Sequence, residues 1–143
     1  MDLTIIIFLL GGLFLGWSLG ANDAANVFGT AVGTRMVKFK TAALVCSVFV
    51  ILGAIISGAG TTETLGKLGA INALPGAFAA CVAAGLSVYI MTKFGLPVST
   101  TQAIVGAIVG WNIYTGYSIN IKILFTILAT WVLCPIIAAL IAM

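Results

Sequence analysis

The chain has 143 residues, of which 62% are hydrophobic and only 6% are charged, and its mean hydropathy is +1.28. Soluble domains carry about 25% charged residues, so this composition excludes a soluble globular domain and indicates an integral membrane protein. The net charge of +3 arises from six basic and three acidic residues, which is a topology signal and not a nucleic-acid-binding surface. We therefore expect the lipid bilayer as a partner and no nucleic acid.

The fold class follows from the need to hydrogen-bond every backbone N–H and C=O group within the protein when the chain lies in lipid. Helices and closed barrels are the structures that pair every backbone group internally, and barrel strands alternate apolar and polar residues in segments of about ten. The apolar runs here are long and unbroken, so we predict an all-α polytopic helical bundle. Three cysteines lie far apart within apolar runs, and we interpret them as packing residues without a disulfide or metal framework: Cys46, Cys81 and Cys134.

The first apolar segment covers residues 3–34 and lacks the basic start of a signal peptide, so we expect a retained helix. As one helix it would be roughly 48 Å long, more than the roughly 30 Å of a hydrocarbon core. It must tilt strongly or break, and we predict a broken helix with the break at Gly20 and the pair Asn22 and Asp23. Glycines four residues apart predict smooth faces for another helix: Gly12, Gly16, Gly20, Gly29 and Gly33.

Asp23 is the first candidate functional residue, because 20 uncharged residues precede it and carry it toward bilayer depth. A carboxylate there costs roughly 2.5 to 3.5 kcal/mol on insertion scales and by default indicates a functional site. Asn22 and Asn26 lie on the same helix face as Asp23, at i,i+3 and i,i+4 spacings. Such hard oxygen ligands suit Na⁺, a proton or a solvated divalent cation. The alternative is that these residues cap a helix break or bind neighbouring helices together.

A basic cluster follows the first segment and sets the expected orientation. Arg35, Lys38 and Lys40 occupy a short loop before the next apolar run. By the positive-inside rule the loop at residues 35–40 is cytoplasmic, which places the N-terminus with Asp2 outside.

The next two segments are expected to span the membrane. Residues 41–62 are uncharged and long enough for a crossing helix. A polar, glycine-rich outer loop is predicted from Thr61, with Glu63 and Lys67 as a solvated i,i+4 pair. Residues 70–92 form the next predicted helix, and Lys93 anchors its inner end.

A second polar block begins where Gly95 and Pro97 break the helical pattern. Residues 98–111 predict a new helix of roughly 21 Å, too short to span, which we interpret as a re-entrant half-helix. Its amino end exposes unpaired N–H groups and the positive end of the helix dipole, which favour an oxyanion. The polar side chains at that end, one of the first two being the expected N-cap, are Ser99, Thr100, Thr101 and Gln102. The alternative is an ordinary polar cap at the interface.

The chain closes with an aromatic and polar connector from Trp111 to Asn120 and a last predicted helix at residues 122–142, which contains a kink at Cys134 and Pro135. It stops without a polar tail, so we expect one half of a larger membrane protein or a shortened chain.

Two blocks carry a family resemblance. Gly-Ala-Asn-Asp-Ala-Ala-Asn at residues 20–26 closely resembles the GANDxAN signature of the inorganic phosphate transporter (PiT) family, whose members are sodium- or proton-coupled phosphate symporters. Gly-Leu-Pro-Val-Ser-Thr-Thr-Gln-Ala at residues 95–103 is similar to a second family block in the expected order. Family members are about twice as long or more and carry a second, related repeat. This chain resembles the first repeat of an inverted-repeat transporter.

The resemblance implies a secondary transporter, not an enzyme, that moves inorganic phosphate by symport with Na⁺ or H⁺ and needs no further cofactor. It implies that Asn22, Asp23 and Asn26 hold the cation, a Na⁺ ion if coupling is to sodium, and that the phosphate ligands are Ser99, Thr100, Thr101 and Gln102. The absence of histidine, of a nucleophile–base pair and of a P-loop agrees with an ion-driven transporter. A less favoured alternative has Arg35 clamp phosphate.

The expected partners are inorganic phosphate, the bilayer of the plasma (inner) membrane, and a second repeat half or a homo-oligomer. Three questions stay open at this point. The coupling ion is Na⁺ or H⁺, the anion is phosphate, a metal-phosphate or a related oxyanion such as sulfate, and the chain either transports or serves as a non-transporting membrane subunit or fragment.

Overall fold

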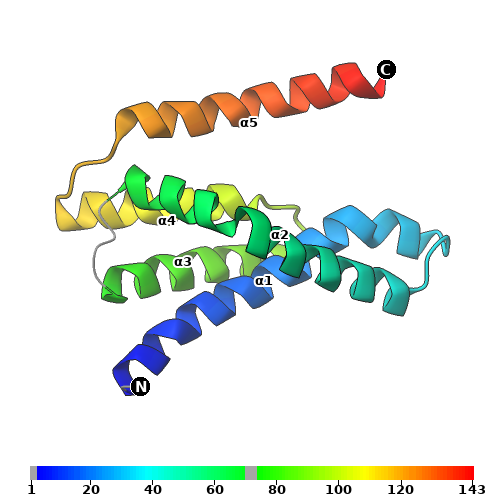
Figure 1. The fold of residues 1–143 in the computed structure, drawn as a ribbon, viewed down its shortest axis with the longest axis horizontal. Coiled ribbons are helices and arrows are strands. Elements are labelled where there is room, and N and C mark those ends of the chain that lie inside the picture. Colours follow the sequence, from blue (N-terminus) through cyan, green and yellow to red (C-terminus); the bar gives the residue numbers. More distant parts are fainter. Residues whose placement is uncertain (1–2, 70–73) are drawn as a thin grey trace.

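The computed structural model describes residues 3–69 and 74–143, and these residues form five α-helices (Figure 1). Their bounds are α1 Leu3–Gly33, α2 Phe39–Leu68, α3 Leu74–Lys93, α4 Thr100–Thr115 and α5 Ile121–Ala142. Four of them, α1, α2, α3 and α5, are long and apolar enough to cross a membrane. The all-helical membrane fold predicted from the composition is confirmed.

The helices pack around the pair formed by α1 and α3. α4 returns antiparallel beside α3, so that α3 and α4 form a hairpin that packs against α1 (Figure 1). α2 and α5 have few neighbours, and no residue of α5 is buried. The chain is thus a three-helix unit with two peripheral helices whose apolar surfaces are largely open.

Small residues set the close approach of α1 to α3. A Cβ atom added at Gly85 of α3 would lie 2.7 Å from the ring of Phe14, and one added at Gly11 of α1 would lie 2.7 Å from the ring of Phe78. Only a residue without a side chain leaves room for these rings. Because lipid supplies no hydrophobic driving force between helices, such tight packing is what stabilises the pair.

The glycines that the sequence singled out occupy other surfaces. A Cβ at any of them would meet no atom within 4 Å: Gly12, Gly16, Gly20, Gly29 and Gly33. The smooth faces of α1 exist, but among the described residues no atom packs closely against these five glycines.

The predicted break in the first segment is wrong. α1 is one helix of 31 residues through Gly20, Asn22 and Asp23. The physical reason is that both side chains find hydrogen-bond partners on the α3–α4 hairpin, so the backbone does not have to open to satisfy them. A single glycine in a helix interior costs only about 1 kcal/mol relative to alanine, which packing can offset.

The second helix differs from its predicted bounds of 41–62, because α2 continues to Leu68 through the segment expected to be an outer loop. Thr62 and Thr64 donate their hydroxyl protons to the carbonyls of Gly58 and Gly60, four residues back. Hydroxyls bonded in this way are compatible with a helix interior. The predicted pair of Glu63 and Lys67 is confirmed as an exposed ion pair.

The other helices also differ at their ends. The predicted helix at 70–92 corresponds to α3, and residues 70–73 lie outside the described residues. α4 runs from Thr100 to Thr115 instead of 98–111, so Trp111 and Tyr114 are helical where a connector was expected. It ends at Gly116, whose positive φ of 74° is the left-handed cap that glycine adopts most easily. α5 starts at Ile121, one residue before the prediction, and contains Pro135.

The tip of the α3–α4 hairpin brings the second polar block to α1. Gly95 has a positive φ of 69°, and the N–H of Leu96 bonds to the carbonyl of Met91 at 3.0 Å. These turns reverse the chain within a few residues, and Ser99 then opens α4. Its hydroxyl accepts the N–H of Gln102 at 3.3 Å, which confirms Ser99 as the N-cap.

Candidate functional site

The two polar blocks of the sequence meet in space. Thr100 in the first turn of α4 donates its hydroxyl proton to Oδ2 of Asp23 on α1, with Oγ1 and Oδ2 3.0 Å apart. Thr100 is only 7% exposed, so little water competes for this bond. The candidate cation residue and a candidate phosphate residue are therefore direct partners, although 77 positions separate them in the chain.

Asn22 ties the tip of the hairpin to α1. Its Nδ2 donates to the carbonyl of Val98 at 2.8 Å and to Oδ1 of Asp23 at 2.7 Å, while its Oδ1 accepts the hydroxyl of Thr92 at 3.3 Å. The side chain is 4% exposed, and a flipped amide would put Oδ1 against two other oxygens. The orientation is thus fixed by its partners. In this arrangement the amide oxygen faces Thr92, so Asn22 positions Asp23 instead of offering a free oxygen beside it.

The remaining predicted residues lie around this centre without joining it. Asn26, one turn along α1, is exposed and has no side-chain hydrogen bond among the described residues. Ser99 uses its oxygen as the helix cap, and the side chains of Thr101 and Gln102 are exposed. Thr101 lines a cavity formed with α2 and α5, on a different side of α4 from Asp23. The four predicted phosphate residues thus do not converge on one point.

The sequence analysis missed two groups at the centre and one beside it. Thr92 and the carbonyl of Val98 contact Asn22 across 70 and 76 positions, and no local pattern signals such contacts. Ser18 lies one turn before Asn22, is 1% exposed, and its hydroxyl has no partner among the described residues. A buried hydroxyl at i−4 from a candidate residue was a signal that helix periodicity could have supplied.

The charge of Asp23 is balanced by hydrogen bonds and not by a basic side chain. Within residues 3–69 and 74–143 the ion pair found is that of Glu63 and Lys67, far from this centre in the sequence. The same residues hold no group of three or more histidine, cysteine or acidic side chains that would bind a transition metal. The carboxylate of Asp23 thus accepts hydrogen bonds from Asn22 and Thr100 and has no basic partner among the described residues.

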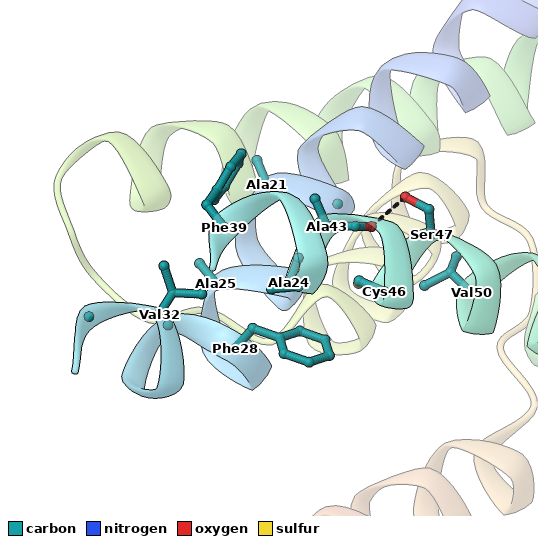
Figure 2. Close-up of a pocket in the computed structure, with 14 residues that line it drawn as sticks. Ala21, Ala24, Ala25, Phe28, Val32, Phe39, Ala43, Cys46, Ser47 and Val50 are labelled. Atoms are coloured by element: carbon teal, nitrogen blue, oxygen red, sulfur yellow. Dashed lines mark hydrogen bonds between the residues drawn. The ribbon is translucent and has the colours of Figure 1, made fainter. Parts of the chain in front are cut away.

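A larger cavity of about 660 Å³ lies between the end of α1 and the start of α2 (Figure 2). Alanines and larger apolar side chains from both helices point into it, including Phe28, Phe39 and Val50. Among the described residues one hydroxyl group lines the cavity, that of Ser47, and it donates to the carbonyl of Ala43 in the same helix. Its other lining residues are glycines, alanines, Cys46 and larger apolar side chains, so the cavity suits apolar groups.

The two polar blocks occur together in a known protein family. Residues 19–143 match the family described as "Phosphate transporter family". The chain belongs to this phosphate transporter family. The match begins just before the Asn22 and Asp23 pair and includes the α3–α4 hairpin, so the contact between the two blocks lies wholly inside it. The family is one of transporters and not of enzymes, as the sequence predicted.

Proteins similar to this chain include members from Thermococcus kodakarensis, Pyrococcus abyssi and Arabidopsis thaliana. Proteins named "Putative phosphate permease" from Thermococcus kodakarensis and Pyrococcus abyssi are 40% and 38% identical to this chain, each over 99% of it. The "Inorganic phosphate transporter 2-1, chloroplastic" of Arabidopsis thaliana is 32% identical over 94% of this chain. The chain covers 37%, 38% and 25% of these three proteins, respectively. No solved structure matches the chain.

Proposed function

We propose that the chain is one repeat of a cation-coupled phosphate symporter that moves inorganic phosphate together with Na⁺ or H⁺. The observation that carries the proposal is the hydrogen bond from Thr100 to Asp23, which joins the candidate cation residue to the amino end of α4. A helix amino end offers unpaired N–H groups and a positive dipole to an oxyanion. Family membership supports phosphate as the anion.

The same bond supplies a physical basis for coupling. With no cation bound, Asp23 accepts the hydroxyl of Thr100 and presents a negative charge that repels an incoming phosphate. A cation or proton on Asp23, with Asn26 one turn away as a further oxygen ligand, cancels that charge and releases the hydroxyl to donate to phosphate. Each ligand then raises the affinity for the other by the same factor. Asn22 keeps the hairpin tip in place during the exchange.

Two features support a re-entrant position for α4. Its 16 residues span about 24 Å, less than the roughly 30 Å of a hydrocarbon core. The hairpin tip contacts α1 at Asn22, about 16 Å along the helix before α1 ends at Gly33. We place the loop at residues 35–40 in the cytoplasm, the N-terminus outside, and the protein in the plasma membrane, because the basic residues cluster in that loop.

Completion of the transporter is proposed to need a second repeat half or another copy of the chain. The chain covers 37% of the Thermococcus kodakarensis relative, and α2 and α5 leave most of their apolar surface without neighbours. The same facts favour a second candidate function, a membrane subunit that binds its ligands but does not transport alone.

The test is uptake of radiolabelled phosphate by proteoliposomes that contain the chain, with an imposed Na⁺ gradient or an imposed pH gradient. Stimulation by one gradient identifies the coupling ion, and sulfate in excess tests the choice of anion. Asp23→Asn, which keeps shape but loses charge, should abolish gradient-driven uptake. Thr126→Val is the matched control, because the Thr126 hydroxyl bonds only to its own helix at the carbonyl of Lys122. Phosphate binding without uptake would favour the subunit function, and wild-type uptake by Asp23→Asn would refute the cation role.

A further inference from the structure

A second cavity, of about 420 Å³, lies between α2, α4 and α5. That volume holds on the order of ten water molecules. Six of the lining side chains carry a polar group, five a hydroxyl and one an indole N–H: Ser57, Thr61, Thr64, Thr101, Thr130 and Trp131. Thr101 belongs to the second signature block, so this cavity reaches the amino end of α4.

Two of the five cavity hydroxyls, those of Thr64 and Thr130, donate to carbonyls of their own helices, and the other three differ from the bonded hydroxyls on the outer faces of the helices. Those of Ser47, Thr62, Ser87 and Thr126 each donate to the carbonyl four residues back in their own helix. Ser57, Thr61 and Thr101 have no hydrogen-bond partner among the described residues; in α1 the hydroxyls of Ser18 and Thr30 also lack one. A hydroxyl facing hydrocarbon needs an internal acceptor, so three free hydroxyls around one cavity indicate contact with water or a polar ligand.

Their spacing makes a continuous polar track. Ser57, Thr61 and Thr64 are four and three residues apart and so lie on one face of α2 over roughly 10 Å. The track starts near Thr101 at the amino end of α4 and runs toward the end of α2, which is the outer end in the proposed orientation. No charged side chain lines it. Neutral donors bind an oxyanion without the strong attraction that would prevent its release.

We propose that this cavity is an outer access site for inorganic phosphate, from which the anion passes to the amino end of α4 with the Thr101 hydroxyl as a shared donor. The inference rests on the proposed function and adds to it a site and a direction of approach. It also explains why adjacent threonines face different partners. Thr100 donates a hydrogen bond to Asp23 while that carboxylate is charged, and Thr101 donates to the incoming phosphate.

The test is thiol labelling of the full chain in proteoliposomes, with the native cysteines first replaced by alanine. Thr61→Cys places a thiol in the cavity, and Thr62→Cys is its matched control, because the neighbouring Thr62 hydroxyl is bonded to its own helix and lines no cavity. A charged methanethiosulfonate reagent reacts with the ionised thiol, which forms in water and not in hydrocarbon. We expect Thr61→Cys to react at least about tenfold faster than Thr62→Cys. Ser57→Cys, a nearly isosteric change, repeats the measurement if Thr61→Cys does not fold.

Phosphate protection then tests occupancy. Inorganic phosphate at ten times its dissociation constant should slow the labelling of Thr61→Cys about tenfold by mass action. Adding Thr101→Val removes a donor to a charged ligand and should raise the phosphate concentration for half-protection about tenfold to hundredfold. Radiolabelled phosphate binding, measured on the same samples with and without Asp23→Asn, reports separately on the proposed function.

The outcomes separate cleanly. Equal labelling of Thr61→Cys and Thr62→Cys means that lipid or another protein surface covers the cavity, and this overturns the inference. Fast labelling without phosphate protection, in samples that bind phosphate, also overturns it while the proposed function stands. If phosphate does not bind at all, both fail. The inference is supported if Thr61→Cys is labelled fast, if phosphate slows this labelling, and if adding Thr101→Val weakens the protection by phosphate.

Discussion

The hydrogen bond between Thr100 and Asp23 predicts a measurable coupling between the two residues. Thr100→Val keeps the β-branched shape and removes the donor, and Asp23→Ala removes the acceptor. A hydrogen bond to a charged group contributes about 1.5 to 3 kcal/mol in soluble proteins, whereas side-chain hydrogen bonds between membrane helices average about 0.6 and reach about 1.7 kcal/mol. The 3.0 Å separation and 7% exposure place this bond at the strong end of the membrane range. We expect a coupling free energy of about 1 to 2 kcal/mol.

A double-mutant cycle on the free energy of unfolding measures this coupling. The wild type, both single variants and the double variant would be unfolded reversibly in mixed micelles and followed by circular dichroism. Thr126→Val should couple to Asp23→Ala by less than about 0.3 kcal/mol, because distant sites are additive within that limit. The same additivity for Thr100→Val and Asp23→Ala would refute the contact and the coupling scheme built on it.

Two further predictions test orientation and packing. In a cysteine-free background, Lys38→Cys should be labelled by an impermeant thiol reagent only from the cytoplasmic side and Lys67→Cys only from outside, and the reverse pattern would invert the assigned topology. Gly85→Val should lower the free energy of unfolding by about 1 to 3 kcal/mol, because its side chain would collide with Phe14, whereas Gly12→Val should change it by less than about 0.5 kcal/mol. Equal effects at the two glycines in chemical unfolding would show that α1 and α3 do not pack as described.

Composition and apolar run length were sufficient to predict the membrane fold and its four long apolar segments, because in lipid the backbone has few alternatives. Asp23 was identifiable because a lone carboxylate in an apolar run is expensive. The helix break predicted beside Asp23 was wrong because the prediction assumed that Asn22 and Asp23 could bond only to the backbone of their own helix. Their actual partners, Thr92, Val98 and Thr100, are 70 to 77 positions away.

The second polar block, residues 95–103, also shows that sequence predicts local contacts better than contacts between helices. The sequence predicted Ser99 or Thr100 as the cap of α4, and the structure confirms the first of these two residues, because capping is local. The sequence grouped Thr100 and Thr101 as equivalent ligands, because both follow the cap and both carry a hydroxyl. Which side of α4 each one faces depends on where α1, α2 and α5 lie, and this is tertiary information. Helix periodicity alone places successive residues about 100° apart but does not say what occupies each direction.

The long separation between Asp23 and its partners also constrains how the protein is made. Asp23 leaves the ribosome 77 residues before Thr100, and at about 5 to 20 residues per second this interval lasts roughly 4 to 15 seconds. Throughout it, the carboxylate of Asp23 lacks its Thr100 partner, and insertion of a carboxylate costs roughly 2.5 to 3.5 kcal/mol. The Thr100 hydrogen bond can lower this cost only after the α3–α4 hairpin has followed α1 into the membrane. Final burial of Asp23 is thus a late step of synthesis, completed only when α3 and the first turn of α4 have been added to the chain.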